Sequence, residues 1–241
     1  MSGVADEPHG IEHSVAAPPV VTVDGPSGAG KGTVSRLLVH RTGWHLLDSG
    51  ALYRLVALAG ERAGLASDDV QGHTRLAVGM DVSFGATRAG LEQIWLGGRD
   101  ITDELRSESA GAGASRVAAW PAVRTALLER QRSFRAPPGL IADGRDMGTV
   151  VFADAELKIF LTASAAERAQ RRYKQLKEKD SGVSLAALSR EIAERDQRDA
   201  SRPVAPLVPA ADAIVLDSTA LTAAEVTEQI YAHGRRRRLW G

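Results

Sequence analysis

Nine residues between a predicted strand and a predicted helix constrain this fold most: Gly25, Pro26, Ser27, Gly28, Ala29, Gly30, Lys31, Gly32 and Thr33. They follow Val20–Asp24, a β-branched run typical of a buried strand, and they precede Val34–His40, which has the apolar spacing of a helix. Such a strand, turn and helix form a phosphate-binding loop, in which backbone N–H groups surround phosphate oxygens. Because Lys31 would reach the outer phosphates of a nucleoside triphosphate, we predict binding of ATP or GTP.

The residue after the lysine narrows the class of nucleotide-binding protein. Gly32 stands where Ser or Thr usually ligates Mg²⁺ directly, and Thr33 follows one position later. This shift argues against a GTPase or a motor-type ATPase. We expect no metal ligands from the protein and Mg²⁺ held mainly by phosphates and water. The alternative, a helix entry that merely needs glycine, is disfavoured because four glycines, the lysine and both flanking elements agree.

Composition excludes several other classes of protein. The 241 residues are 44% hydrophobic, and 30 basic residues balance 30 acidic ones, which argues against general nucleic-acid binding. The absence of cysteine excludes disulfides, thiolate metal sites and cysteine catalysis. No apolar run is long enough to span a membrane, and residues 1–19 lack the basic and apolar regions of a signal peptide. We therefore expect a flexible tail at 1–19, a cytoplasmic protein and no membrane partner.

Alternating strands and helices predict a three-layer α/β/α fold with a parallel sheet. The predicted strands are Val20–Asp24, Trp44–Leu47, Leu140–Ala142, Leu157–Leu161 and Ala213–Leu216. The predicted helices are Lys31–Arg41, Ala51–Ala63, Val117–Phe134, Ala165–Lys179, Leu185–Ala200 and Ala223–Ala232. Short polar-apolar strands with glycine turns predict a small antiparallel β insertion over Leu76–Arg106, within an acceptor region of about 66–110. One domain would span 20–232, with a lid at about 166–202 and a basic, solvated tail at 233–241.

Two segments after predicted strands carry candidate binding groups. Ser49 is a plausible N-cap that would also meet a ligand, and Arg54 lies one turn into the following helix, where a guanidinium can clamp a phosphate. Asp143, Arg145 and Asp146 follow the strand Leu140–Ala142, at the sheet edge where ligands bind in open α/β folds. Asp143 would act near a metal or acceptor oxygen, Arg145 would bind phosphate, and Asp146 would accept from a base amine. The alternatives are that Arg54 is an ordinary surface arginine and that Asp143, Arg145 and Asp146 belong to a charged turn with an internal Asp–Arg pair.

Two arginine-rich helices joined by a loop at Lys179–Ser184 predict a mobile lid over the transferring phosphates. Helical spacing gives each helix a charged face, with Arg168, Arg171 and Arg172 on the first and Arg195, Asp199 and Arg202 on the second. The alternative is two exposed amphipathic helices with internal ion pairs. We favour the lid.

Together these stretches resemble the bacterial cytidylate kinases, which are P-loop nucleoside monophosphate kinases. The resemblance covers about residues 20–231 and is carried by Asp24–Thr33, His45–Arg54, Ser115–Phe134, Gly139–Phe152, Arg195–Ala211 and Val215–Thr219. GLIADGRDMGTVVF and VAPLVPAADAIVLDST are specific to the family, whereas the phosphate loop is not. The β insertion fits this family as well.

The resemblance implies transfer of the ATP γ-phosphoryl group to CMP or dCMP, with Mg²⁺ and as a monomer. It implies that Lys31 meets the transferring group and that Arg54, Arg145 and Arg202 hold the CMP phosphate. With Asp143 from its position after the strand, the candidate catalytic residues are Lys31, Asp143, Arg145 and Arg202. Cytosine would be read by Ser115, Arg124 and Asp146. The sugar would be contacted by Arg195 and Asp199, with Ser49 nearby, and ATP by Arg168.

Two other functions remain open at this point. A P-loop kinase for UMP, AMP or a small metabolite would share the phosphate loop but lack the cytosine-reading trio. A non-catalytic nucleotide sensor or RNA-binding module would use the basic lid and tail. Charge neutrality and few aromatic residues for stacking argue against the second.

Overall fold

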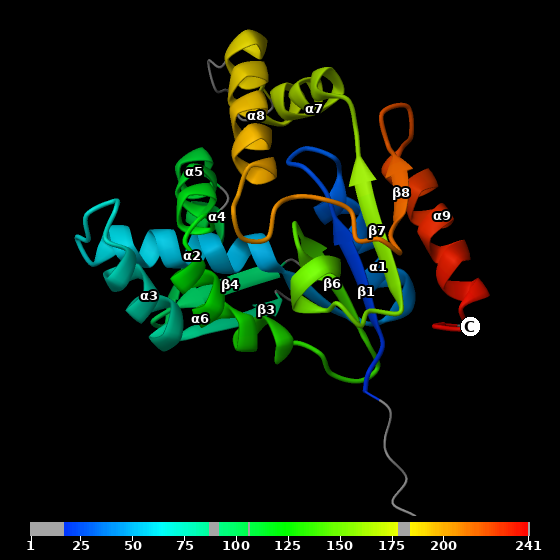
Figure 1. Cartoon of the computed structure of the whole chain (residues 1–241), viewed down its shortest axis with the longest axis horizontal. Helices are drawn as coiled ribbons and strands as arrows, with labels where there is room; N and C mark the ends of the chain where they lie inside the picture. The colour runs from blue at the N-terminus through cyan, green and yellow to red at the C-terminus, as the bar shows by residue number, and fades with distance from the viewer. Residues whose placement is uncertain (1–16, 87–91, 106, 178–183, 241) are drawn as a thin grey trace, which may run out of the picture.

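A five-stranded parallel sheet forms the centre of the molecule (Figure 1). The computed structural model describes residues 17–86, 92–105, 107–177 and 184–240. The sheet has the order β2-β6-β1-β7-β8, and each strand lies within two residues of its predicted bounds. Its strands are β1 (Val20–Asp24), β2 (His45–Asp48), β6 (Leu140–Gly144), β7 (Leu157–Thr162) and β8 (Ile214–Asp217). The predicted fold class is confirmed.

Helices cover both faces of this sheet and extend to one side of it (Figure 1). The first three helices along the chain are α1 (Lys31–Thr42), α2 (Ser49–Arg62) and α3 (Val70–Gly79). The later ones are α4 (Thr102–Leu105), α5 (Glu108–Val117), α6 (Pro121–Arg132), the π-helical turn η1 (Met147–Val151), α7 (Ala165–Lys177), α8 (Leu185–Ala200) and α9 (Ala223–Arg236).

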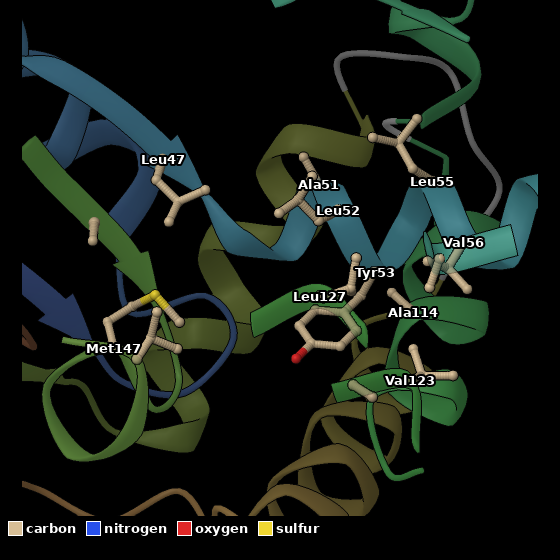
Figure 2. Close-up of a cluster of buried hydrophobic side chains, with 14 of the residues drawn as sticks. Leu47, Ala51, Leu52, Tyr53, Leu55, Val56, Ala114, Val123, Leu127 and Met147 are labelled. Carbon is tan, nitrogen blue, oxygen red and sulfur yellow. The ribbon is translucent and has the colours of Figure 1, made fainter. Parts of the chain in front are cut away.

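Alternate residues of β1, the central strand, face two separate hydrophobic cores, because successive side chains of a strand point to opposite faces of the sheet. Val21 and Val23 pack in one core with residues of α1 and α9. Val20 belongs to the other core, with residues of α2, α5, α6 and η1. Figure 2 shows part of this second core, in which Leu52 of α2 and Leu127 of α6 are fully buried. All of β1 is therefore buried and packed on both faces, which fixes the point at which the phosphate loop begins.

The predicted β insertion is present but shorter than its predicted range. It is an antiparallel sheet of β3 (Val82–Ala86), β4 (Glu92–Leu96) and β5 (Arg99–Asp100). Within the predicted acceptor region of about 66–110, α3, α4 and the start of α5 flank this sheet, and α3 was missed. Asp69 caps α3, because its carboxylate accepts a hydrogen bond from Gly72 N at 2.8 Å. The predicted glycine turn at Gly90 lies outside the described residues.

The helix predicted over Val117–Phe134 is present but shorter, because α6 spans Pro121–Arg132 and a separate helix precedes it. α5 ends at Val117 and α6 begins at Pro121. Trp120 is extended (φ −89°, ψ 117°), as the residue before proline usually is. Pro121 itself suits the first helical position, where its missing N–H costs nothing.

The other helices follow their predictions with changed ends. α8 has its predicted bounds, whereas α7 ends at Lys177. Residues 179–183 of the predicted lid loop lie outside the described part. The N-cap of α2 is Asp48 instead of Ser49, since the Asp48 carboxylate accepts from Ala51 N at 3.1 Å. A carboxylate is as good a cap as a hydroxyl, so Ser49 becomes the first helical residue.

The C-terminal residues pack onto the domain beside α9. That helix continues to Arg236, four residues beyond its predicted end. Trp240 stacks on Tyr231 (ring centroids 5.3 Å apart), meets the edge of Trp44 at 5.2 Å, and donates its indole N–H to Tyr231 O at 3.0 Å. A Cβ at Gly234 would lie 1.9 Å from the Trp240 ring, so this packing requires glycine there.

Candidate functional site

The glycine-rich loop leaves the carboxyl end of β1 and enters α1 in the conformation that the sequence predicts. Gly25 has φ +148°, and a Cβ on it would lie 1.9 Å from Leu161 O of β7. Gly30 has φ +95° and is the N-cap of α1. A side chain would clash at Gly25 and would be strained by the positive φ at Gly30. The loop backbone is therefore tightly curled at the amino end of a helix, where N–H groups lack intrahelical partners. This arrangement suits an anion.

Lys31 is buried against this loop, with 6% of its surface exposed. Its ammonium donates to Pro26 O at 3.0 Å. Burial, followed by the positive charge of Arg145, lowers the pKa of Lys31 to about 7, although the charge of Asp143 opposes the change. Burial in turn raises the pKa of Asp143 to about 6. Lys31 is thus a cation whose charge is poorly compensated by its surroundings, and a phosphate would compensate it.

Asp143 and Arg145 lie at the carboxyl end of β6, beside the phosphate loop. A Cβ on Gly32 would lie 3.5 Å from Asp143 Oδ2. Arg145 Nε donates to Asp199 Oδ2 at 3.0 Å, and Arg202 pairs with the other oxygen of Asp199. Burial would raise the pKa of Asp199, but the charges of Arg145 and Arg202 hold it below its usual range. One buried carboxylate therefore holds two of the predicted phosphate-binding guanidiniums.

Asp146 forms a buried ion pair with Arg124 of α6. Arg124 also donates to Ala118 O at 3.2 Å, and its guanidinium lies 5.6 Å from the Tyr53 ring centroid. Arg202 is close enough to Arg124 and Asp146 for their charges to affect its pKa, which burial lowers. The structure thus joins two predicted base-reading residues to the predicted phosphate-binding set.

Ser115, the third predicted base-reading residue, is buried on α5, and its hydroxyl has no hydrogen-bond partner among the described residues. An unpartnered buried hydroxyl is costly unless a ligand or water satisfies it.

The predicted residues of α2 flank the same edge of the sheet. Arg54 lies 3.6 Å from Asp48 Oδ2, and Asp48 faces Asp143 across the β2–β6 pair. Ser49 is buried, and a Cβ on Gly144 would lie 2.7 Å from its hydroxyl oxygen.

Arg168 connects α7 and α8 to the phosphate loop. It donates to Ser27 O at 3.0 Å and forms a two-pronged pair with Asp196 of α8 at 3.0 and 2.5 Å. Arg171 donates to Ser218 Oγ and O, and the Ser218 hydroxyl donates in turn to Ala29 O at 3.0 Å. The shared face that the sequence predicts thus brings two arginines to the loop.

Two more arginines come from α7 and α8. Arg172 of α7 donates to Gln175 on its own helix at 3.2 Å, and burial lowers its pKa, with the charges of Glu191 and Arg54 acting in opposite directions. Arg195 is largely buried on α8, and burial, followed by the charge of Arg145, lowers its pKa to about 10. Its Nε has no hydrogen-bond partner within the described ranges. Arg195 therefore keeps capacity to bind an anion or a hydroxyl.

Sequence reasoning missed three carboxylates and one hydroxyl group that hold these arginines and the loops of the site. Asp48, Asp196 and Ser218 were not singled out, and neither was Asp24. Asp24 ends β1 and accepts hydrogen bonds from two backbone amides of η1, and burial raises its pKa to about 7. The available signal was an acidic residue at the end of an otherwise apolar buried strand. No three His, Asp or Glu side chains of the described ranges cluster as a metal site, and no described helix has the length and apolar character to cross a membrane.

Comparison with known proteins identifies the family. The cytidylate kinase family model matches residues 21–236. A cytidylate kinase of Pseudomonas fluorescens SBW25 is 60% identical over 213 residues, which cover 88% of this chain and 93% of the relative. Those of Stutzerimonas stutzeri (58%; 92% and 98% covered) and Marinomonas sp. MWYL1 (57%; 89% and 94% covered) are similarly close. With this coverage, and with the phosphate loop and its flanking charges at one sheet edge, the chain belongs to the cytidylate kinase family.

Proposed function

We propose that this protein transfers the γ-phosphoryl group of ATP to CMP or dCMP. The bond between the γ-phosphorus and the β-phosphate oxygen breaks while a bond to an acceptor phosphate oxygen forms, which gives ADP and CDP or dCDP. Family membership over almost the whole chain supports this reaction. The observation that carries it is the Asp199 bridge between Arg145 and Arg202, which gathers guanidiniums beside Lys31 and the phosphate loop.

In this proposal the protein contributes charge neutralisation and alignment. Phosphoryl transfer requires two anions in line, and a lysine and arginines lower the cost of bringing them together. Lys31 meets the transferring group, and Arg54, Arg145 and Arg202 hold the acceptor phosphate. Arg168 contacts ATP above residues 25–33.

Mg²⁺ would enter with ATP and supply further neutralisation of phosphate charge. The residues fit an ion held mainly by phosphates and water, because one carboxylate, Asp143, borders the loop at Gly32 and Thr33 follows one residue later. We propose that Asp143 acts from the protein side, toward metal-bound water or the acceptor oxygen.

Base selection would come from Asp146, Arg124 and Ser115. Cytosine carries an amine donor at C4, which a carboxylate accepts, whereas uracil presents a carbonyl there. The Asp146–Arg124 pair is buried, and its low-dielectric surroundings strengthen discrimination between matched and mismatched polar groups. Arg195 and Asp199 would contact the sugar, with Ser49 nearby.

The test is ADP release from Mg-ATP with CMP, dCMP, UMP, AMP and GMP as parallel acceptors. We expect strong turnover with CMP and dCMP and little with the other three. Preference for another acceptor would retain phosphate-loop chemistry but overturn the base-reading roles. Absence of turnover with all five would contradict the proposal and favour a nucleotide-binding module.

A further inference from the structure

Asp24 is the last residue of β1 and directly precedes Gly25, the first residue of the phosphate loop. It is 5% exposed and faces Gly144 of β6 and Phe160 of β7 across the sheet. A carboxylate buried at this depth needs hydrogen bonds to compensate for lost hydration. Its partners therefore indicate what it does.

Both carboxylate oxygens of Asp24 accept hydrogen bonds from backbone amides of η1. Met147 N donates to Oδ1 at 2.9 Å and Gly148 N donates to Oδ2 at 2.8 Å. These amides open η1, and the first N–H groups of any helical turn lack partners within it. Asp146, the N-cap of η1, makes no side-chain cap bond, and its carboxylate pairs with Arg124. Asp24 thus performs the capping that would otherwise engage Asp146.

η1 packs closely against β1, the strand that carries the phosphate loop. A Cβ on Gly148 would lie 2.8 Å from Thr22 Oγ1 of β1. The two hydrogen bonds that Asp24 accepts therefore connect the strand before the phosphate loop to the turn that begins at Asp146.

We propose that Asp24 is a positioning residue that sets the Asp146 turn relative to the phosphate loop, and thereby maintains both base selection and phosphate alignment. This inference rests on the proposed role of Asp146 in reading cytosine. A displacement of about 1 Å in a reacting site can lower the rate about 100-fold, so a small shift of the turn is sufficient to matter.

The test variant is Asp24→Asn, which keeps the shape of the side chain but offers one acceptor oxygen to two amides. The matched control is Thr22→Val on the same strand, because Thr22 is fully buried and its hydroxyl has no partner among the described residues. For each protein we would measure kcat/KM for CMP and UMP, KM for Mg-ATP, and hydrogen exchange at the amides of Met147 and Gly148.

We expect Asp24→Asn to lower kcat/KM for CMP by about tenfold or more, to reduce the CMP-to-UMP ratio and to speed exchange at both amides. KM for Mg-ATP should change less than about threefold, and Thr22→Val should behave as the wild type in all four measurements. Equal losses for CMP and UMP, or unchanged exchange at both amides, would overturn the proposal.

Exchange in the unaltered protein keeps the inference testable if Asp24→Asn does not fold. The amides of Met147 and Gly148 should be protected as strongly as those of β1, and exchange at the rate of exposed amides would overturn the inference. The underlying function fails in a different way. A wild type that does not prefer CMP to UMP contradicts the role of Asp146, whereas the exchange data still decide whether Asp24 holds the turn.

Discussion

Replacing Asp146 by asparagine tests base selection with little disturbance of the fold. The side chain keeps its shape, and its amide oxygen can still accept from Arg124, whose side chain is 9% exposed. Asp146→Ala also removes the proposed contact to cytosine, but it leaves Arg124 as an unpaired buried charge, which costs about 3 kcal/mol or more in stability. Asp146→Asn separates the loss of selection from the loss of stability.

The expected size follows from the hydrogen bond that is lost. A hydrogen bond to a charged group contributes about 1.5 to 3 kcal/mol, and about 1.4 kcal/mol corresponds to tenfold. Since the asparagine retains a neutral acceptor, the lower figure applies, and kcat/KM for CMP should fall about tenfold. The value for UMP should be unchanged or higher, because the new amide N–H₂ can donate to the C4 carbonyl of uracil.

The assay is ADP release with CMP and UMP at saturating Mg-ATP, together with urea unfolding of both proteins. Asp212→Asn is the matched control, because this carboxylate is 65% exposed and pairs with Lys158 at 3.0 Å on another part of the surface. It should leave the CMP-to-UMP ratio unchanged. Equal losses for both acceptors in Asp146→Asn would refute the base-reading argument.

Three further predictions concern protonation, phosphate alignment and the C-terminal packing. At pH 8, Lys31 with a pKa of about 7 is mostly neutral, and bound phosphates would raise this pKa. ATP binding should therefore take up about 0.9 proton, measured by calorimetry in buffers of different ionisation enthalpy. Lys31→Met should take up no proton, and an absence of proton uptake in the wild type would contradict the reasoning. Asp199→Asn should raise KM for CMP about tenfold and change that for ATP less, because Arg145 and Arg202 lose their shared anchor; equal effects on both substrates would refute this anchor. Trp240→Ala should lower the free energy of unfolding by about 2 kcal/mol in urea with kcat unchanged, and a change below about 0.5 kcal/mol would show that the packing contributes little.

The sequence predicts elements well where local pattern and burial coincide. The bounds of β1 and α8 are correct to the residue. A β-branched run between proline and glycine flanks, and an amphipathic run after Ser184, each have one reasonable interpretation. α3 and α5 were missed because they are short and rich in glycine or alanine, and their signals are the capping residues Asp69 and Ser107. From the sequence, the segment that contains η1 can be interpreted only as a charged turn. The residue that caps its two N-terminal amides is Asp24, more than 120 residues earlier in the chain, so no local capping signal is present.

The candidate site shows a similar limit. Motif spacing brings the cationic residues to one sheet edge, since the carboxyl ends of parallel strands meet there. The pairing of those cations is not local. Asp199 bridges Arg145 across 54 residues, and Asp196 reaches Arg168 across 28. No periodicity specifies which carboxylate meets which guanidinium, because that depends on where the tertiary fold places α7 and α8 relative to the sheet edge.

The two hydrogen bonds that Asp24 accepts from η1 have a consequence for protein engineering. The turn that begins at Asp146 is not a self-contained module that can be transplanted on its own, because its first amides are hydrogen-bonded to the last residue of β1. A chimera that grafts residues 143–152 onto another P-loop kinase would need an acidic residue before the first loop glycine. Without it the graft would carry two unsatisfied buried amides, and changes of acceptor in this scaffold therefore require the two segments to be exchanged as one unit.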